Sequence, residues 1–114
     1  MRAINVSRGT LLADTIQHAR TLWARSRGLL GRDGLEAGEG LLLQPCSGIH
    51  TFGMRFPIDA VFLDGEARAV HLVQEMGPQR VSRYVFKARS VLELPPGTIR
   101  STGTRLGDRL VLEE

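Results

Sequence analysis

The sequence predicts an α+β domain that is mostly β, with a small closed or strongly curved barrel-like sheet and one or two short helices. Two observations favour this class. Short apolar runs alternate with turn residues along the whole chain, and only two brief segments carry helix signals. The chain has 114 residues, the size of one domain with one core, so we expect residues 1–114 to form a single domain.

The first third of the chain predicts short strands followed by one helix. Residues 6–11 are typical of a turn between two strands, and the second strand resumes over residues 15–19. Thr21 can cap a short helix over residues 22–27, which a glycine then ends. Residues 31–40 are rich in glycine, but their spacing matches neither phosphate-binding fingerprint. We interpret them as a connector before a strand that begins at Leu41.

The centre of the chain predicts a hairpin with one long arm. The alternating residues 50–56 lead into an apolar run over residues 58–63. Asp64 and Gly65 form a strong tight-turn signal, and residues 67–73 return as the partner strand.

The last third predicts further strands and a single helical turn. After a Gly-Pro turn come residues 81–86, and then a strand over residues 90–94 that stops at two prolines. Thr98 can cap a final helical turn. Residues 106–112 are typical of a turn and a terminal strand.

Cysteine content and hydropathy predict a cytoplasmic protein. Cys46 is the only cysteine, which excludes an internal disulfide and a disulfide-stapled secreted scaffold. The first residues lack the apolar run of a signal peptide, and no run approaches the roughly 20 residues needed to span a bilayer. We therefore expect no membrane partner.

The charge pattern argues against a nucleic-acid partner. The formal net charge is +3, and Lys87 is the only lysine among 15 basic residues. The arginines are spread from Arg2 to Arg109, whereas a nucleic-acid interface needs them gathered on one face beside stacking aromatic residues.

Four segments give the chain a resemblance to a known family. They are RGLLGR (27–32), HTFGMRFPIDAVFLD (50–64), VLELPPGT (91–98) and GDRL (107–110). In these segments, from about residue 19 to residue 110, the chain resembles the bacterial and archaeal domain-of-unknown-function family 192. The resemblance implies a small β-rich domain, found with or without a secretion signal, that has no assigned activity.

The chain departs from the family pattern at one place. Many members carry Trp-Met-Lys-Asn-Thr where this sequence has HTFGM over residues 50–54, so the asparagine position falls on Gly53. The resemblance therefore implies no site built on that amide here, while Asp59 keeps its matching position.

Cys46, His50 and Met54 are spaced by four residues and are ligand types that suit a soft metal. Prolines and glycines around them prevent a helix, and an extended chain would separate successive members by about 13 Å. We therefore predict no metal and no cofactor.

A thiol beside an imidazole, such as Cys46 beside a histidine, can also act as a nucleophile. Nothing in the sequence brings the two together, so we assign no catalytic residue.

Five residues are candidates for a binding site. Asp59 interrupts an apolar run and, if buried, needs partners. Arg55 would lie about 13 Å from Asp59 on an extended strand. The partner of Asp59 would then be Arg80 or backbone N–H groups. Asp59 is then either a structural brace or the charged floor of a pocket. Glu93 admits the same two interpretations, or faces water, and His50 completes the set.

These observations leave two functions open. The first is a non-catalytic binding or interaction module with an unknown protein or small-molecule ligand. The alternative is an enzyme of unknown reaction with a pocket around Asp59. A concave site that holds Asp59, an arginine and a histidine would favour the enzyme. A filled barrel with an exposed apolar edge would favour partner binding.

Overall fold

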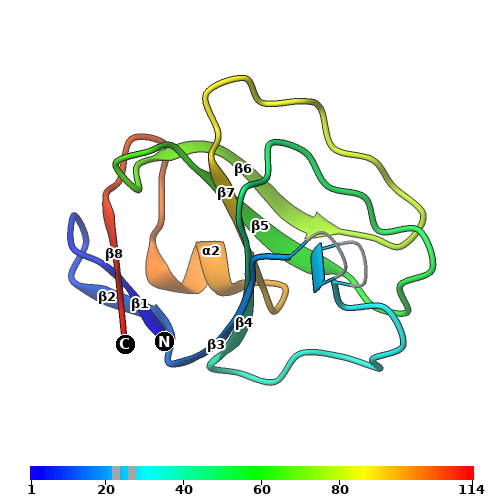
Figure 1. Cartoon of the computed structure of the whole chain (residues 1–114). Coiled ribbons are helices and arrows are strands. Elements are labelled where there is room, and N and C mark those ends of the chain that lie inside the picture. Colours follow the sequence, from blue (N-terminus) through cyan, green and yellow to red (C-terminus); the bar gives the residue numbers. More distant parts are fainter. Residues whose placement is uncertain (22–23, 26–27) are drawn as a thin grey trace.

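The structure, a computed structural model, describes residues 1–21, 24–25 and 28–114. These residues form eight strands in two sheets, with a short helix, α2 (Thr98–Thr102), beside them (Figure 1). The domain is therefore α+β and mostly β, as the sequence predicts. The strands are β1 (Arg2–Asn5), β2 (Thr10–Ala13), β3 (Thr15–Ala19), β4 (Glu39–Leu43), β5 (Ile58–Leu63), β6 (Ala69–Met76), β7 (Ser90–Leu94) and β8 (Leu110–Glu113).

The larger sheet has five strands in the order β3-β4-β7-β5-β6. β3 and β4 are parallel, and the other neighbours are antiparallel. Every residue of β5 and β7 is buried, because these strands are central and covered on both faces. The smaller sheet has the order β2-β1-β8 and is antiparallel.

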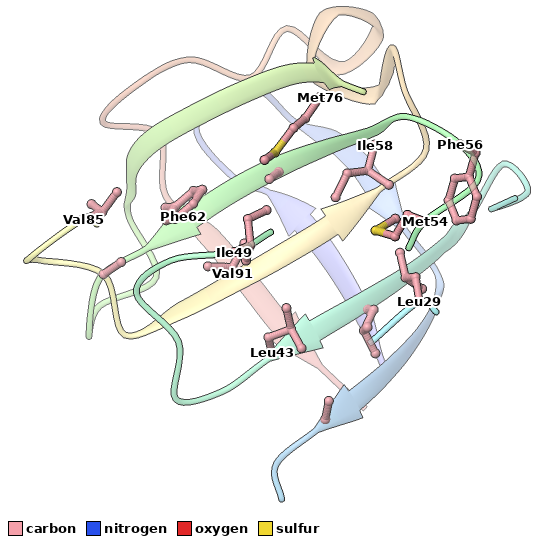
Figure 2. Close-up of a cluster of buried hydrophobic side chains, with 14 residues drawn as sticks. Leu29, Leu43, Ile49, Met54, Phe56, Ile58, Phe62, Met76, Val85 and Val91 are labelled. Carbon is pink, nitrogen blue, oxygen red and sulfur yellow. The ribbon is translucent and has the colours of Figure 1, made fainter. Parts of the chain in front are cut away.

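The larger sheet is the middle layer between two hydrophobic clusters. Side chains alternate along β5, so Ile58 and Phe62 belong to one cluster while Val61 and Leu63 belong to the other. Figure 2 shows the first cluster, in which side chains of the sheet meet those of the connecting loops. The second cluster joins the sheet to α2 and to the smaller sheet.

Neither sheet is closed in the described residues, so the predicted barrel is not confirmed. β3 and β6 lie at opposite edges of the larger sheet. The smaller sheet contributes to the core on one face of the larger sheet, and the isolated bridge between Arg68 and Arg109 connects the two. The short strands thus bury their apolar faces by layering, which satisfies the same hydrophobic pattern as closure.

The predicted long arm of the central hairpin is wrong. β5 begins at Ile58, and β6 pairs with it across the Asp64-Gly65 turn as expected. Residues 50–56 instead form an irregular loop, because the N–H of Met54 donates to the carbonyl of Thr51 and closes a turn. Residues 81–86 are also a loop, and Val81 alone bridges to His50.

The two helix predictions have different outcomes. The helix predicted over residues 22–27 lies partly outside the described residues; within them, the N–H of Ala24 donates to Thr21 Oγ1 at 3.0 Å. Helix α2 forms where predicted, but its N-cap is Gly97, and the Thr98 hydroxyl donates to the carbonyl of Pro95. No helix in the described residues is long and apolar enough to cross a membrane.

Candidate functional site

A cavity of about 370 Å³ opens between the loop-covered face of the larger sheet and the connecting segments. Its volume is in the range of small-molecule sites. Figure 2 shows four of its apolar lining side chains, Leu29, Leu43, Ile49 and Met54, gathered over this face. The full lining consists of Arg25, Gly28, Leu29, Leu30, Leu43, Pro45, Cys46, Ser47, Gly48, Ile49, His50, Met54 and Glu93.

One wall of this pocket is a loop that is fixed by backbone hydrogen bonds to a distant loop. The carbonyls of Ser47 and Ile49 accept from the N–H groups of Val85 and Ser82, at 2.8 and 2.9 Å. Ile49 and Val85 are both buried. The wall is therefore held by hydrogen bonding and by apolar packing, which favours a pocket that exists before any ligand binds.

Glu93 lies at the floor of the pocket. It pairs with Leu41 on β4 and with Ala60 on β5, so its side chain shares the loop-covered face of the sheet. The residue is 3% exposed, and within the described residues its carboxyl group has no hydrogen-bond or ion-pair partner. Burial away from water raises the pKa of Glu93 to about 7. A buried, unpaired carboxyl group that faces a cavity is well placed to contact a ligand.

The other polar groups that line the pocket already have partners. Arg25 Nη1 donates to the carbonyl of Pro45 at 2.7 Å, and Ser47 Oγ donates to the carbonyl of Ala88 at 2.9 Å. His50 Nδ1 accepts from the N–H of Phe52 at 3.2 Å. The Cys46 thiol donates to the carbonyl of Gly48 at 3.2 Å. Glu93 differs from these side chains because neither of its carboxyl oxygens has a partner in the described residues, whereas Arg25 and His50 each use one nitrogen and keep others free.

Cys46, His50 and Met54 all line this pocket, so the extended-chain separation is wrong. The turn at Thr51 to Met54 folds the segment back over the sheet. Three His, Cys, Asp or Glu side chains do not come close enough anywhere in the described residues to hold a metal ion. Burial, together with the nearby charge of Glu93, raises the pKa of the Cys46 thiol, which disfavours the thiolate needed for nucleophilic attack.

Asp59 lies on the opposite face of the sheet and does not line this pocket. Its Oδ1 accepts from the N–H of Glu75 and its Oδ2 from the N–H of Ile99, both at 2.8 Å. Backbone groups, and not Arg80, are thus its partners in the described residues. The contact with Glu75 supports a residue of β6 with a positive φ of 51°, and the contact with Ile99 begins helix α2.

The remaining two candidates lie elsewhere. Arg55 forms an exposed ion pair with Asp33 at 2.8 Å. Arg80 lines a different cavity, beside Met76 and Val81. Of the five residues proposed from the sequence, the structure brings only His50 and Glu93 to one pocket.

Sequence reasoning missed Arg25 and the pocket role of Cys46. The signal for Glu93 was present, because a carboxylate stands inside a short apolar strand.

The structure also gives a physical reason for a glycine at position 53. Its φ is +79°, a conformation that glycine and asparagine tolerate best, and an added Cβ would lie 3.2 Å from Leu30 Cδ2. Glycine therefore meets the backbone requirement of this turn.

Comparisons with known proteins agree with this picture of the fold. Residues 3–112 match the family DUF192, described as "Uncharacterized ACR". No curated protein matches the chain. A structure of a candidate transcription regulator from Sinorhizobium meliloti 1021 is 24% identical, with a TM-score of 0.80, over 96% of this chain and 89% of that one. A protein of unknown function from Novosphingobium aromaticivorans DSM 12444 is 19% identical, with a TM-score of 0.79, over 98% and 93%. At these identities the likeness shows the fold alone.

Proposed function

Because the chain belongs to DUF192, a family without an assigned activity, we propose its function from the pocket: a non-catalytic module that binds a small organic molecule. The observation that carries this proposal is Glu93, a buried carboxyl group without a partner in the described residues, at the floor of a mostly apolar cavity. Folding a carboxylate into such a place costs free energy, and a bound ligand would recover it.

The pocket's chemistry favours binding over catalysis. Catalysis by a nucleophile and a base needs an activated group, but the Cys46 thiol has a raised pKa and donates to a backbone carbonyl. The alternative placed an enzyme site around Asp59, and both oxygens of that carboxylate accept hydrogen bonds from backbone N–H groups. A ligand would have to displace these bonds.

We also place this binding in a reducing compartment such as the cytoplasm. Cys46 is the only cysteine of the chain, and burial raises its pKa. A lone thiol without a partner in its own chain suits a reducing environment.

A fragment screen followed by nuclear magnetic resonance tests the proposal. We expect small aliphatic fragments to shift the backbone amides of residues 46–50 and 93, which border the cavity. Cys46→Phe should fill the pocket and abolish these shifts. Leu11→Phe, at a half-exposed residue of β2, introduces the same aromatic side chain away from the pocket and should leave them unchanged. Fragments that bind Cys46→Phe as well as the unaltered chain would contradict the proposal.

A further inference from the structure

The pocket has one buried acidic group whose two oxygens lack a partner in the described residues, Glu93, and this restricts the chemistry of its ligand. Arg25, Ser47, Cys46 and His50 are each engaged with backbone groups, as described above. Arg25 also forms no ion pair with Glu93. Within the described residues, Glu93 is therefore the buried lining group with the most to gain from a polar contact with a ligand, and Arg25 and His50 keep further nitrogens for a second one.

A cation satisfies Glu93 better than a neutral donor does. A hydroxyl group would supply a hydrogen bond but leave the buried negative charge uncompensated. An ammonium group supplies both the hydrogen bond and the opposite charge, and such charge-assisted bonds are stronger. An anion would meet the like charge of Glu93 and the opposite charge of Arg25, so hexanoate is the competing probe in the test below.

The rest of the lining indicates an aliphatic body for the ligand. The side chains of Leu29, Leu30, Leu43, Ile49 and Met54 form the apolar surface, and among the described lining residues only His50 has an aromatic ring. Aliphatic walls of this kind suit an alkyl chain.

We propose that this pocket binds a primary amine on an aliphatic body, with the ammonium group paired to the carboxylate of Glu93. This inference rests on the proposed function and names its ligand class. The pairing requires Glu93 to be ionised, so binding of the amine should release a proton from Glu93 below neutral pH.

The pH dependence of binding is the sharpest consequence. The free pocket has a Glu93 pKa of about 7, so roughly one tenth of the chains are ionised there at pH 6 and nine tenths at pH 8. Alkylamines remain protonated across this interval, like lysine. Amine binding should therefore strengthen about tenfold from pH 6 to pH 8. The other titratable or charged lining groups are Arg25, Cys46 and His50.

Titration calorimetry with n-hexylamine, n-hexanol and hexanoate tests the inference. We expect n-hexylamine to bind most tightly at pH 8 and to show the tenfold pH dependence. Glu93→Gln keeps the shape of the side chain and should weaken amine binding more than tenfold and remove its pH dependence. Glu66→Gln removes the same charge from an exposed turn outside the pocket and serves as the matched control.

His50 requires its own control, because a protonated imidazole would also repel an amine at pH 6. His50→Gln should retain the tenfold pH dependence if Glu93 is the titrating group. Loss of that dependence in His50→Gln, or equal amine binding by Glu93→Gln, would overturn the inference.

The outcomes separate the ligand class from the proposed function. Binding of n-hexanol or hexanoate at the pocket amides, with n-hexylamine weaker than both, would reject the amine and leave a small-molecule module standing. If neither the three probes nor the fragment screen shifts those amides, both the amine inference and the proposed small-molecule function are rejected.

Discussion

Asp59 caps helix α2 from 40 residues away, with Asp59 Oδ2 accepting a hydrogen bond from the N–H of Ile99 at 2.8 Å. The first turn of a helix has free N–H groups that are normally satisfied by a residue just before it. Here Gly97 is at that position and supplies no side chain. The cap therefore comes from a central strand of the sheet, which ties the helix to the core.

Asp59→Ala should destabilise the protein by about 3 kcal/mol, because a buried and a partly buried backbone N–H group both lose their acceptor. Urea unfolding at pH 7 measures this loss directly. A loss below about 1 kcal/mol would contradict the bracing role.

Asp59→Asn should cost less than Asp59→Ala. The amide offers one acceptor oxygen, so the N–H of either Glu75 or Ile99 keeps its bond while the other faces an NH₂ donor. Equal losses for the two substitutions would show that the second oxygen has no separate effect.

Glu93 should make the protein less stable as the pH rises through the neutral range. Its pKa is raised from 4.5 to about 7 in the folded chain, so stability is greatest below pH 4.5 and declines until the pH passes 7. The decline should amount to about 3 kcal/mol. Urea unfolding of wild type and Glu93→Gln at pH 5 and pH 8 would measure it.

The substitution serves as its own control, because glutamine cannot titrate. The Glu93→Gln variant should lack this decline and be more stable than wild type at pH 8. Equal pH profiles for the two proteins would show that Glu93 is ionised without cost in the folded state.

The Cys46 thiol should react slowly with a thiol-specific reagent near neutral pH. Burial raises its pKa and the charge of Glu93 adds to this, so little thiolate is present. The rate of reaction with a disulfide reagent should rise steeply above pH 9 and be somewhat faster in Glu93→Gln. A rate at pH 7 equal to that of the urea-unfolded chain would contradict this expectation.

Asp108 should support stability at acidic pH. Burial opposes its ionisation, but hydrogen bonds from Arg8 Nε, Asn5 Nδ2 and the N–H of Arg105 outweigh burial and lower its pKa from 3.8 to about 2. Its contribution is therefore present above pH 4 and is lost as the pH falls to 2.

Asp108→Asn tests this contribution. The variant should be less stable than wild type at pH 6, and the difference should shrink toward pH 2, as thermal melts across this interval would show. A difference that does not change with pH would assign the effect to packing alone.

Local sequence patterns were sufficient for most of the strands. The tight turn at Asp64-Gly65 and the apolar runs on either side predict β5 and β6, and the double proline correctly ends β7 after Leu94. Period-two alternation misled at residues 50–56, because a glycine with positive φ and a backbone hydrogen bond turned the segment into a loop. The alternation of apolar and polar residues carries no information about such a turn.

The sequence by itself determined that the domain is mostly β, that it belongs to its family, and that Asp59 and Glu93 are acidic residues inside apolar strands. Only the tertiary structure decided their different roles. Asp59 pairs with Leu94, and Glu93 with Ala60, so the two side chains point to opposite faces of one sheet. The helix and its backbone donors cover one face, and the loops that leave a cavity cover the other. Strand register and layer packing join residues far apart in the chain, and no local pattern encodes that pairing.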